Sequence, residues 1–216
     1  MANSGPESGT STATLRLAIG TLKIAHPISV PTGRVRAADT IPALQGLVNA
    51  VVQAAEAETV GKGEAVSCRK GCGACCRQLV PVSRSEGERL LDVIAAMPAD
   101  RQDSLRARFA EAEKKIAAAG LNERAGRSDR ELSVAYFALR QPCPFLEDES
   151  CSIHPERPLV CREYLVTSPA ERCAGPAQEG VTPVAVPKVS LAVRKLQDDR
   201  DDWFPLALLL AWARTR

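Results

Sequence analysis

The sequence has little of what most enzyme and nucleic-acid sites require. Aromatic residues make up 4% of its 216 residues, and histidine occurs twice. So few rings leave little surface on which unpaired bases could stack. A formal net charge of +2, with 25% charged residues, describes an ordinary solvated surface. We therefore expect no nucleic-acid partner. No catalytic carboxylate pair, Ser–His constellation or phosphate-binding glycine loop is recognisable, so the residues alone assign neither a reaction nor a catalytic residue.

Long hydrophobic runs are also missing. The most apolar stretch, residues 203–213, is short against the ~20 residues that span a bilayer. It is expected to form a buried C-terminal helix that begins at Pro205 and is capped by Asp201 or Asp202, with a dimer contact as the alternative. The N-terminus shows no basic start followed by an apolar run, so no secretory signal is expected. These features predict a cytoplasmic protein without a membrane span, in a reducing compartment where disulfides are rare.

Cysteine, by contrast, is abundant, and four of the eight cysteines lie in one short segment, Cys68-Arg-Lys-Gly-Cys72-Gly-Ala-Cys75-Cys76. In a reducing compartment this density indicates a metal site. Gly71 and Gly73 permit left-handed turns that make the segment converge. The adjacent Cys75 and Cys76 fit one tetrahedral ion poorly, because neighbouring side chains diverge. Either the pair bridges two metal centres, or one member is a buried thiol behind the metal ligands.

A second cysteine group lies between residues 141 and 164. Its prolines, at positions 142, 144, 155 and 158, restrict the backbone and lower the entropy lost when distant thiols gather round a metal. We predict that both groups bind zinc or iron, or an iron–sulfur cluster. The predicted metal ligands are Cys68, Cys72, Cys75, Cys76, Cys143, Cys151 and Cys161. Seven thiols exceed the four ligands of one zinc ion, so either two metals bind or some thiols lie behind the ligands.

These motifs resemble those of the YkgJ-like cysteine-cluster family, whose domain is described as zinc- or iron-chelating and is named for a CxxCxxCC motif. The matching residues are Cys72-Gly-Ala-Cys75-Cys76, Cys143-Pro-Phe-Leu, Cys151-Ser-Ile-His and Arg157-Pro-Leu-Val-Cys161-Arg. The resemblance covers roughly Val66 to Tyr164. One departure is the gap after Cys68, which is three residues where the family name implies two. The resemblance implies metal binding and leaves the biological role and any protein partner unknown.

Other functions stay open. The family is similar to the cysteine domain of flagellin lysine-N-methylases, which implies a protein-lysine N-methyltransferase, or a component of one, as an alternative. A structural zinc site in an interaction module is a second alternative. The spacing Cys68-x3-Cys72-x2-Cys75 also matches that of radical S-adenosylmethionine enzymes, but Ala74 stands where those enzymes usually carry an aromatic residue. The repeated strand–helix pattern of their barrel is not seen in the sequence either.

Several polar residues near the cysteines have two interpretations. His154 could ligate the metal or only form hydrogen bonds in its turn, and Cys173 could be a ligand or lie in a loop outside the site. Arg157 and Arg162 stand between fixed prolines and predicted ligands. We expect them to stabilise the negative charge of metal-bound thiolates.

The rest of the chain predicts a mainly α fold, α+β with a small N-terminal β element, in which helices surround a cysteine-rich metal site built from loops. Residues 1–13 are expected to be a disordered tail, and residues 14–216 a single domain with the cysteine-cluster region at 66–176. Alternation from Leu15 predicts a strand pair or a bulged strand, which Pro27, Pro31 and Gly33 then break. Apolar periodicity and breakers predict helices at about 42–58, 85–97, 99–119, 131–140 and 189–196.

Overall fold

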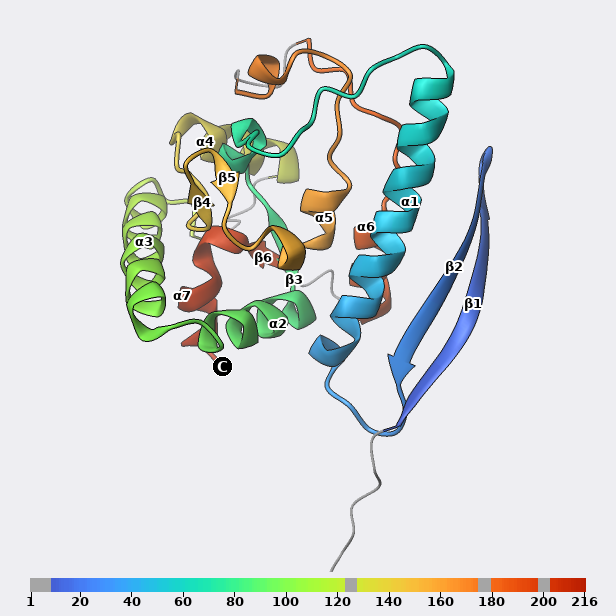
Figure 1. Ribbon diagram of the computed structural model, residues 1–216. Coiled ribbons are helices and arrows are strands. Elements are labelled where there is room, and N and C mark those ends of the chain that lie inside the picture. Colours follow the sequence, from blue (N-terminus) through green and yellow to red (C-terminus); the bar gives the residue numbers. More distant parts are fainter. Residues whose placement is uncertain (1–8, 123–127, 175–179, 198–202) are drawn as a thin grey trace, which may run out of the picture.

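A computed structural model describes residues 9–122, 128–174, 180–197 and 203–216. Within these ranges the chain is mainly helical and carries three two-stranded antiparallel sheets, the first of them an N-terminal hairpin (Figure 1). The predicted fold class, mainly α with a small N-terminal β element, is therefore confirmed.

The N-terminal hairpin consists of β1 (Thr10–Ile19) and β2 (Leu22–Pro31). Ile19 pairs with Leu22, and Gly20 takes the left-handed φ of 59° that the tight turn between them requires. The predicted tail was too long, because strand pairing orders the chain from Thr10; residues 1–8 lie outside the described residues. The strand also continues past Pro27 to Pro31, which a two-stranded sheet tolerates because each strand has a free edge.

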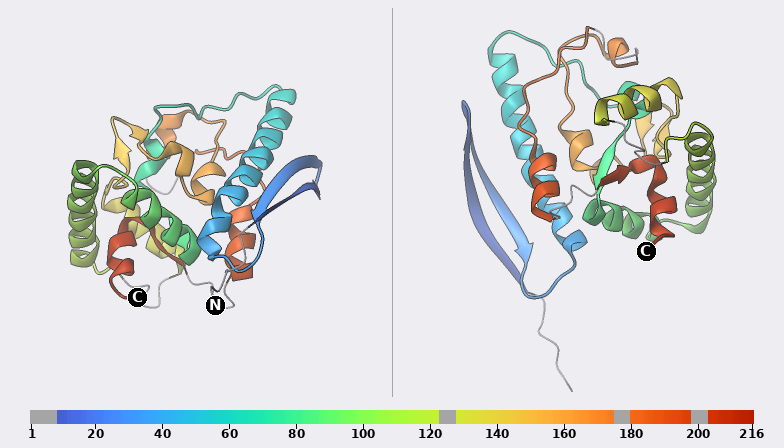
Figure 2. Two further views of the ribbon diagram at one scale, coloured as in Figure 1. Left: turned by 60° about the horizontal axis from the view of Figure 1, so that its bottom comes forward. Right: turned by 180° about the vertical axis from the view of Figure 1, so that it is seen from behind.

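The hairpin packs on α1 (Ile41–Gly61), which follows the short 3-10 helix η1 (Ala37–Thr40). Leu22 and Ile24 of β2 are buried in one cluster with apolar residues of α1. Gly46 lets the imidazole of His26 approach the helix, since a Cβ there would lie 3.3 Å from Nε2. Figures 1 and 2 show the hairpin along the outer side of α1, at the edge of the molecule.

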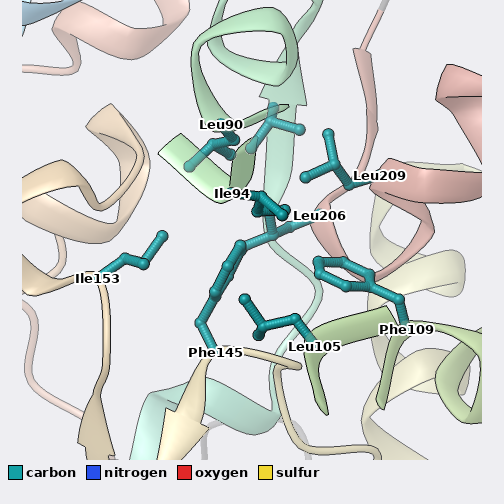
Figure 3. Packing of buried hydrophobic residues seen from close by; sticks show 9 residues of the cluster. Leu90, Ile94, Leu105, Phe109, Phe145, Ile153, Leu206 and Leu209 are labelled. Atoms are coloured by element: carbon teal, nitrogen blue, oxygen red, sulfur yellow. The ribbon is translucent and has the colours of Figure 1, made fainter. Parts of the chain in front are cut away.

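The main core lies beside α2 (Arg84–Ala95) and α3 (Ala99–Ala118). Ser83 begins α2 with a capping box, in which its hydroxyl accepts from the Glu86 amide and the Glu86 carboxylate accepts from the Ser83 amide. Figure 3 shows the apolar cluster that these helices cover. Its buried members are Val82, Leu90, Ile94, Leu105, Phe109, Phe145, Ile153, Leu206 and Leu209.

The C-terminal segment closes this core, but it is not helical throughout. Residues Trp203–Pro205 form β6, which pairs with β3 (Pro81–Ser83). The 3-10 helix η6 (Leu206–Leu208) and α7 (Leu209–Ala213) follow. Four consecutive residues, 206–209, are buried, which agrees with the predicted buried C-terminal helix from Leu206 onward. The predicted caps Asp201 and Asp202 lie outside the described residues.

The remaining elements surround the cysteines. They are η2 (Ala74–Arg77), α4 (Asp129–Ala138), β4 (Leu146–Glu147), β5 (Ser150–Cys151), η3 (His154–Glu156), α5 (Leu159–Arg162), η4 (Ala170–Ala174) and α6 (Val189–Gln197). Helices α1, α5 and α6 meet through Val48, Leu159 and Val193, which are all buried. The predicted helices therefore exist, with ends that differ by a few residues. Among the described residues, none of the helices combines the length and the apolar character needed to cross a membrane.

Candidate metal centre

The first cysteine motif is a chain of tight turns. The amide of Cys72 donates to the carbonyl of Arg69 at 3.1 Å, and Gly71 has a φ of 86°, as the third residue of such a turn requires. The amide of Cys76 then donates to the carbonyl of Gly73 at 3.0 Å within η2. These turns place Cys72, Cys75 and Cys76 on a compact loop. The left-handed turn predicted at Gly71 is confirmed, whereas the one predicted at Gly73 is wrong, because Gly73 has a φ of −94°.

The start of this motif is held by a segment almost one hundred residues later in the chain. The amide of Ser67 donates to the carbonyl of Val166 at 2.9 Å, and its hydroxyl donates to the carbonyl of Thr167 at 3.1 Å. The Cys68 thiol lies 4.0 Å from the carbonyl of Tyr164 and donates to it. Cys68 is therefore placed beside the segment that follows Cys161.

The second motif joins the first through the main chain. The amide of Cys143 donates to the carbonyl of Cys76 at 2.7 Å. After Cys143 the chain forms the β4–β5 hairpin, in which Cys151 pairs with Leu146. Its turn residues Asp148 and Glu149 have positive φ values of 46° and 54°, the conformation of a tight two-residue hairpin loop.

An arginine and a glycine bring this hairpin against η2. The Arg77 guanidinium donates to the Glu149 carboxylate at 2.5 and 3.0 Å and to the carbonyl of Gly73 at 3.1 Å. Gly73 itself has no room for a side chain, because a Cβ would lie 2.7 Å from both Glu149 Oε2 and Leu146 Cδ1. A glycine at this position is what lets the two cysteine motifs touch.

Cys161 is positioned by the short helix α5, whose first turn is fixed by buried polar groups. The amide of Leu159 donates to the buried carboxylate of Glu86 at 2.9 Å. Arg162 is 4% exposed. Its guanidinium donates to the carbonyl of Arg157 at 2.9 Å, to Asn49 Oδ1 at 2.9 Å and to the carbonyl of Pro155. Arg162 thus orders the loop before Cys161 through its backbone carbonyls.

Cys173 lies in η4, which packs against η2. Its carbonyl accepts a hydrogen bond from the Gln78 side chain at 3.3 Å, and the residue is 3% exposed. The loop-like sequence around it gave no sign of this position. The only signal available was that it is a further cysteine soon after Cys161.

One cavity of about 210 Å³ connects these segments. Cysteines of both motifs line it, together with three cationic side chains, His154 and Tyr164. The lining cysteines are Cys68, Cys72, Cys75, Cys161 and Cys173, and the cations are Arg69, Lys70 and Arg157. No aspartate or glutamate is among the described residues that line the cavity.

The thiols share an environment that opposes ionisation. Burial is the largest cause that raises the pKa of Cys68, Cys151, Cys161 and Cys173, and it raises the pKa of Cys143 to about 12. A hydrogen bond with the Cys76 side chain, followed by burial, raises the pKa of Cys75. Such thiols become thiolates only when a positive charge joins them, so the donor set fits a soft metal cation.

The charge effects also link sulfurs of the two motifs. A charge on Cys75 raises the pKa of Cys143, Cys151 and Cys161. A charge on Cys151 also raises the pKa of Cys143, and charges on Cys143 and Cys151 raise the pKa of Cys161. Each pair among Cys75, Cys143, Cys151 and Cys161 is therefore coupled. One sulfur of the first motif and three of the second form a group of four.

Arg157 supplies the opposite charge. It lowers the pKa of Cys68, Cys75, Cys151 and Cys161, against the larger effects that raise them. Its Nε atom is buried and has no hydrogen-bond partner among the described residues. The arginine therefore lies where the sequence predicted it, next to the cysteines.

The sulfurs do not yet form a finished metal site. In the described part of the chain, no three His, Cys, Asp or Glu side chains are close enough together to hold an ion as they stand. All eight cysteines are free thiols. The seven predicted ligands thus come from segments that meet in space: four of them line the cavity, Cys143 and Cys151 couple to these, and Cys76 contacts Cys143 through its carbonyl.

Comparison with known proteins gives one match. A family model described as "CxxCxxCC: Putative zinc- or iron-chelating domain" matches residues 67–179, about half of the chain. The match extends past Tyr164, where the resemblance read from the motifs ended, and includes Cys173. No curated protein and no solved structure matches the chain.

Proposed function

Since the chain belongs to the CxxCxxCC family of zinc- or iron-chelating domains, we propose that its two cysteine motifs close together on a zinc or iron centre. The observation that carries this proposal is that the two motifs meet: the Cys143 amide donates to the Cys76 carbonyl at 2.7 Å, and cysteines of both motifs line one cavity. The charge effects among Cys75, Cys143, Cys151 and Cys161 agree with this arrangement. Four thiolates complete the tetrahedral shell of a structural zinc ion and equally suit an iron–sulfur cluster.

The charge balance of the site supports a cation at this position. The raised pKa values mean that the four thiols are protonated at neutral pH, so a metal must displace their protons as it binds. Four thiolates on one divalent ion leave a net negative charge. Arg157 is placed to offset that charge, because its own charge lowers the pKa of Cys75, Cys151 and Cys161.

Metal binding must also draw the sulfurs inward, because as they stand no three potential ligands among the described residues are close enough to hold an ion. The cysteines lie in short turns and 3-10 helices, which can shift without unfolding a long helix. The β4–β5 hairpin and η2 are already joined by the Cys143–Cys76 hydrogen bond and the Arg77–Glu149 ion pair. We therefore expect small movements of loops about a framework that already exists.

The eight free thiols also suit a reducing compartment, and we propose the cytoplasm. The test of the proposed function is anaerobic purification followed by elemental analysis and an absorption spectrum. Colourless protein with stoichiometric zinc, or brown protein with iron and sulfide, would support the proposal and would also identify the metal. Protein that contains neither metal, and that takes up neither on reconstitution, would contradict it.

A further inference from the structure

Cys173 lies outside the two cysteine motifs that the proposed function brings together. It is buried in η4, and η4 packs on η2, the element that carries Cys75 and Cys76. A buried cysteine can be a small apolar residue and nothing more. Cys173, however, lines the same cavity as Cys68, Cys72 and Cys75, and three of the cavity's other lining residues carry positive charge.

One tetrahedral site does not use all the cysteines that line the cavity. Cys75, Cys143, Cys151 and Cys161 are enough to saturate one tetrahedral ion. Cys68, Cys72 and Cys173 then remain on the cavity wall, next to Cys75. Burial raises the pKa of the Cys173 thiol most, and charges on Cys75, Cys68 and Cys72 each raise it further. Charges on Cys75 and Cys72 also raise the pKa of Cys68.

The geometry points to a second metal-binding site in this cavity, formed by Cys68, Cys72 and Cys173 with Cys75 as a sulfur shared between two ions. This inference rests on the proposed function, since it takes the first site as occupied. A thiolate has enough lone pairs to bridge two soft cations. Each zinc–sulfur bond would be about 2.3 Å long. The sulfurs that line the cavity of about 210 Å³ must therefore move inward to reach the ion, because no three potential ligands among the described residues are close enough as they stand. The ligand class is a soft divalent cation, with Zn²⁺ as the probe.

The proposed second site also gives the adjacent residues Cys75 and Cys76 different roles. Cys75 faces the cavity, while the carbonyl of Cys76 accepts the hydrogen bond from Cys143. Cys75 shares the cavity wall with Cys68, Cys72 and Cys173 and also interacts electrostatically with the second motif, as a shared sulfur must. Cys76 holds the second motif in place through its main chain.

The test is the number of zinc ions per chain after anaerobic reconstitution of the full-length protein with excess Zn²⁺ and removal of unbound metal. We expect two ions in the wild type, one in Cys173→Ser and one in Cys151→Ser. The matched control is Ala170→Ser, which places a hydroxyl in the same 3-10 helix and on the same cavity wall without removing a thiol, and should keep two. One ion in the wild type, or two in a folded Cys173→Ser, would overturn the second site. A wild type that binds no zinc would overturn the second site, and one that also takes up no iron on reconstitution would overturn the proposed function as well.

A second measurement does not depend on how a variant folds. Wild-type protein loaded with ¹¹³Cd²⁺, which replaces zinc at thiolate sites, should give two ¹¹³Cd NMR signals in the range of sulfur-rich coordination. A single such signal from protein that has bound cadmium would contradict a second site.

Discussion

The amide of Cys143 donates a hydrogen bond to the carbonyl of Cys76 at 2.7 Å, which joins the two cysteine motifs through the main chain. This bond does not depend on any thiol or metal. It places the β4–β5 hairpin against η2 before an ion binds, so the entropy of bringing the two motifs together is lost during folding and not during metal binding.

Replacing Gly73 by alanine should loosen the contact between the two motifs. The added Cβ would lie 2.7 Å from Glu149 Oε2 and Leu146 Cδ1, two side-chain ends that can turn aside, and 3.0 Å from the Glu149 carbonyl, so the hairpin backbone must shift by a few tenths of an ångström. We expect unfolding to become easier by about 1–3 kcal/mol, together with a lower metal content. Urea unfolding and elemental analysis measure the two effects. Gly61→Ala, at a position with nothing within 4 Å, is the matched control and should change neither property adversely.

Replacing Arg162 by lysine should weaken the loop that presents Cys161. A single ammonium group cannot make the three separate contacts of the guanidinium with Asn49 and the carbonyls of Pro155 and Arg157. A loss of about 2 kcal/mol in unfolding free energy is expected, because partly buried carbonyls lose a charged donor. Thermal unfolding of the metal-free and metal-loaded forms measures it. Arg106→Lys, on the exposed side of α3, should cost far less. Equal losses in the two variants would contradict this role for Arg162.

The metal-free protein should lose stability at alkaline pH. Burial raises the pKa of the Cys143 thiol from 9.0 to about 12, and it also raises the pKa values of Cys151 and Cys161. A raised pKa means that the folded state keeps its protons while the unfolded state loses them. The stabilisation is therefore complete below pH 9.0 and is lost as pH rises toward 12. Each such thiol contributes a slope of about 1.4 kcal/mol per pH unit.

Denaturant unfolding at pH values on either side of 9.0 tests this slope, and the metal-loaded protein is the control. Bound thiolates carry no proton to lose, so the loaded form should be less sensitive to pH over this range. If the metal-free form shows a flat profile through the same range, the thiols are not buried as described.

Replacing Gly87 by alanine should affect the core and leave the metal site alone. A Cβ on Gly87 would lie 2.7 Å from Phe204 Cζ and 2.9 Å from Trp212 Cζ3, two rings that stack with their centroids 4.4 Å apart. We expect a loss of about 1–3 kcal/mol in unfolding free energy with the metal content per folded chain unchanged. A variant that loses metal in proportion to stability would show that the core and the site are one cooperative unit.

Local sequence signals predicted much of this fold, and non-local packing accounts for what they missed. The apolar periodicity of α1 and α3 and the break at Pro98 placed those helices to within a few residues. Trp203–Pro205 was expected to lead into a helix, yet it forms β6 because β3 lies alongside to pair with it. The residues from Thr10 to Ala13 have no bulky apolar group, and only their partner strand β2 orders them.

In the candidate site too, local sequence signals predicted some features and non-local packing determined the others. The spacing of the first motif and Gly71 predicted the turn that leads into Cys72, whereas the left-handed turn predicted at Gly73 does not form. The proline-bounded loops predicted that the second motif would be presented to the first. Neither signal could place Cys173, because its position depends on the packing of η4 against η2. Tyr164 reaches the cavity only because its segment runs beside Ser67 and Cys68.

The most direct test of the central claim is a thiol-protection measurement on the wild-type chain. Metal-free and metal-loaded protein are alkylated under reducing, anaerobic conditions, and mass spectrometry then gives the modified fraction at each cysteine. We predict that one metal addition protects Cys75 of the first motif together with Cys143, Cys151 and Cys161 of the second. Protection confined to cysteines of a single motif, with the other motif as reactive as before, would contradict a shared metal centre.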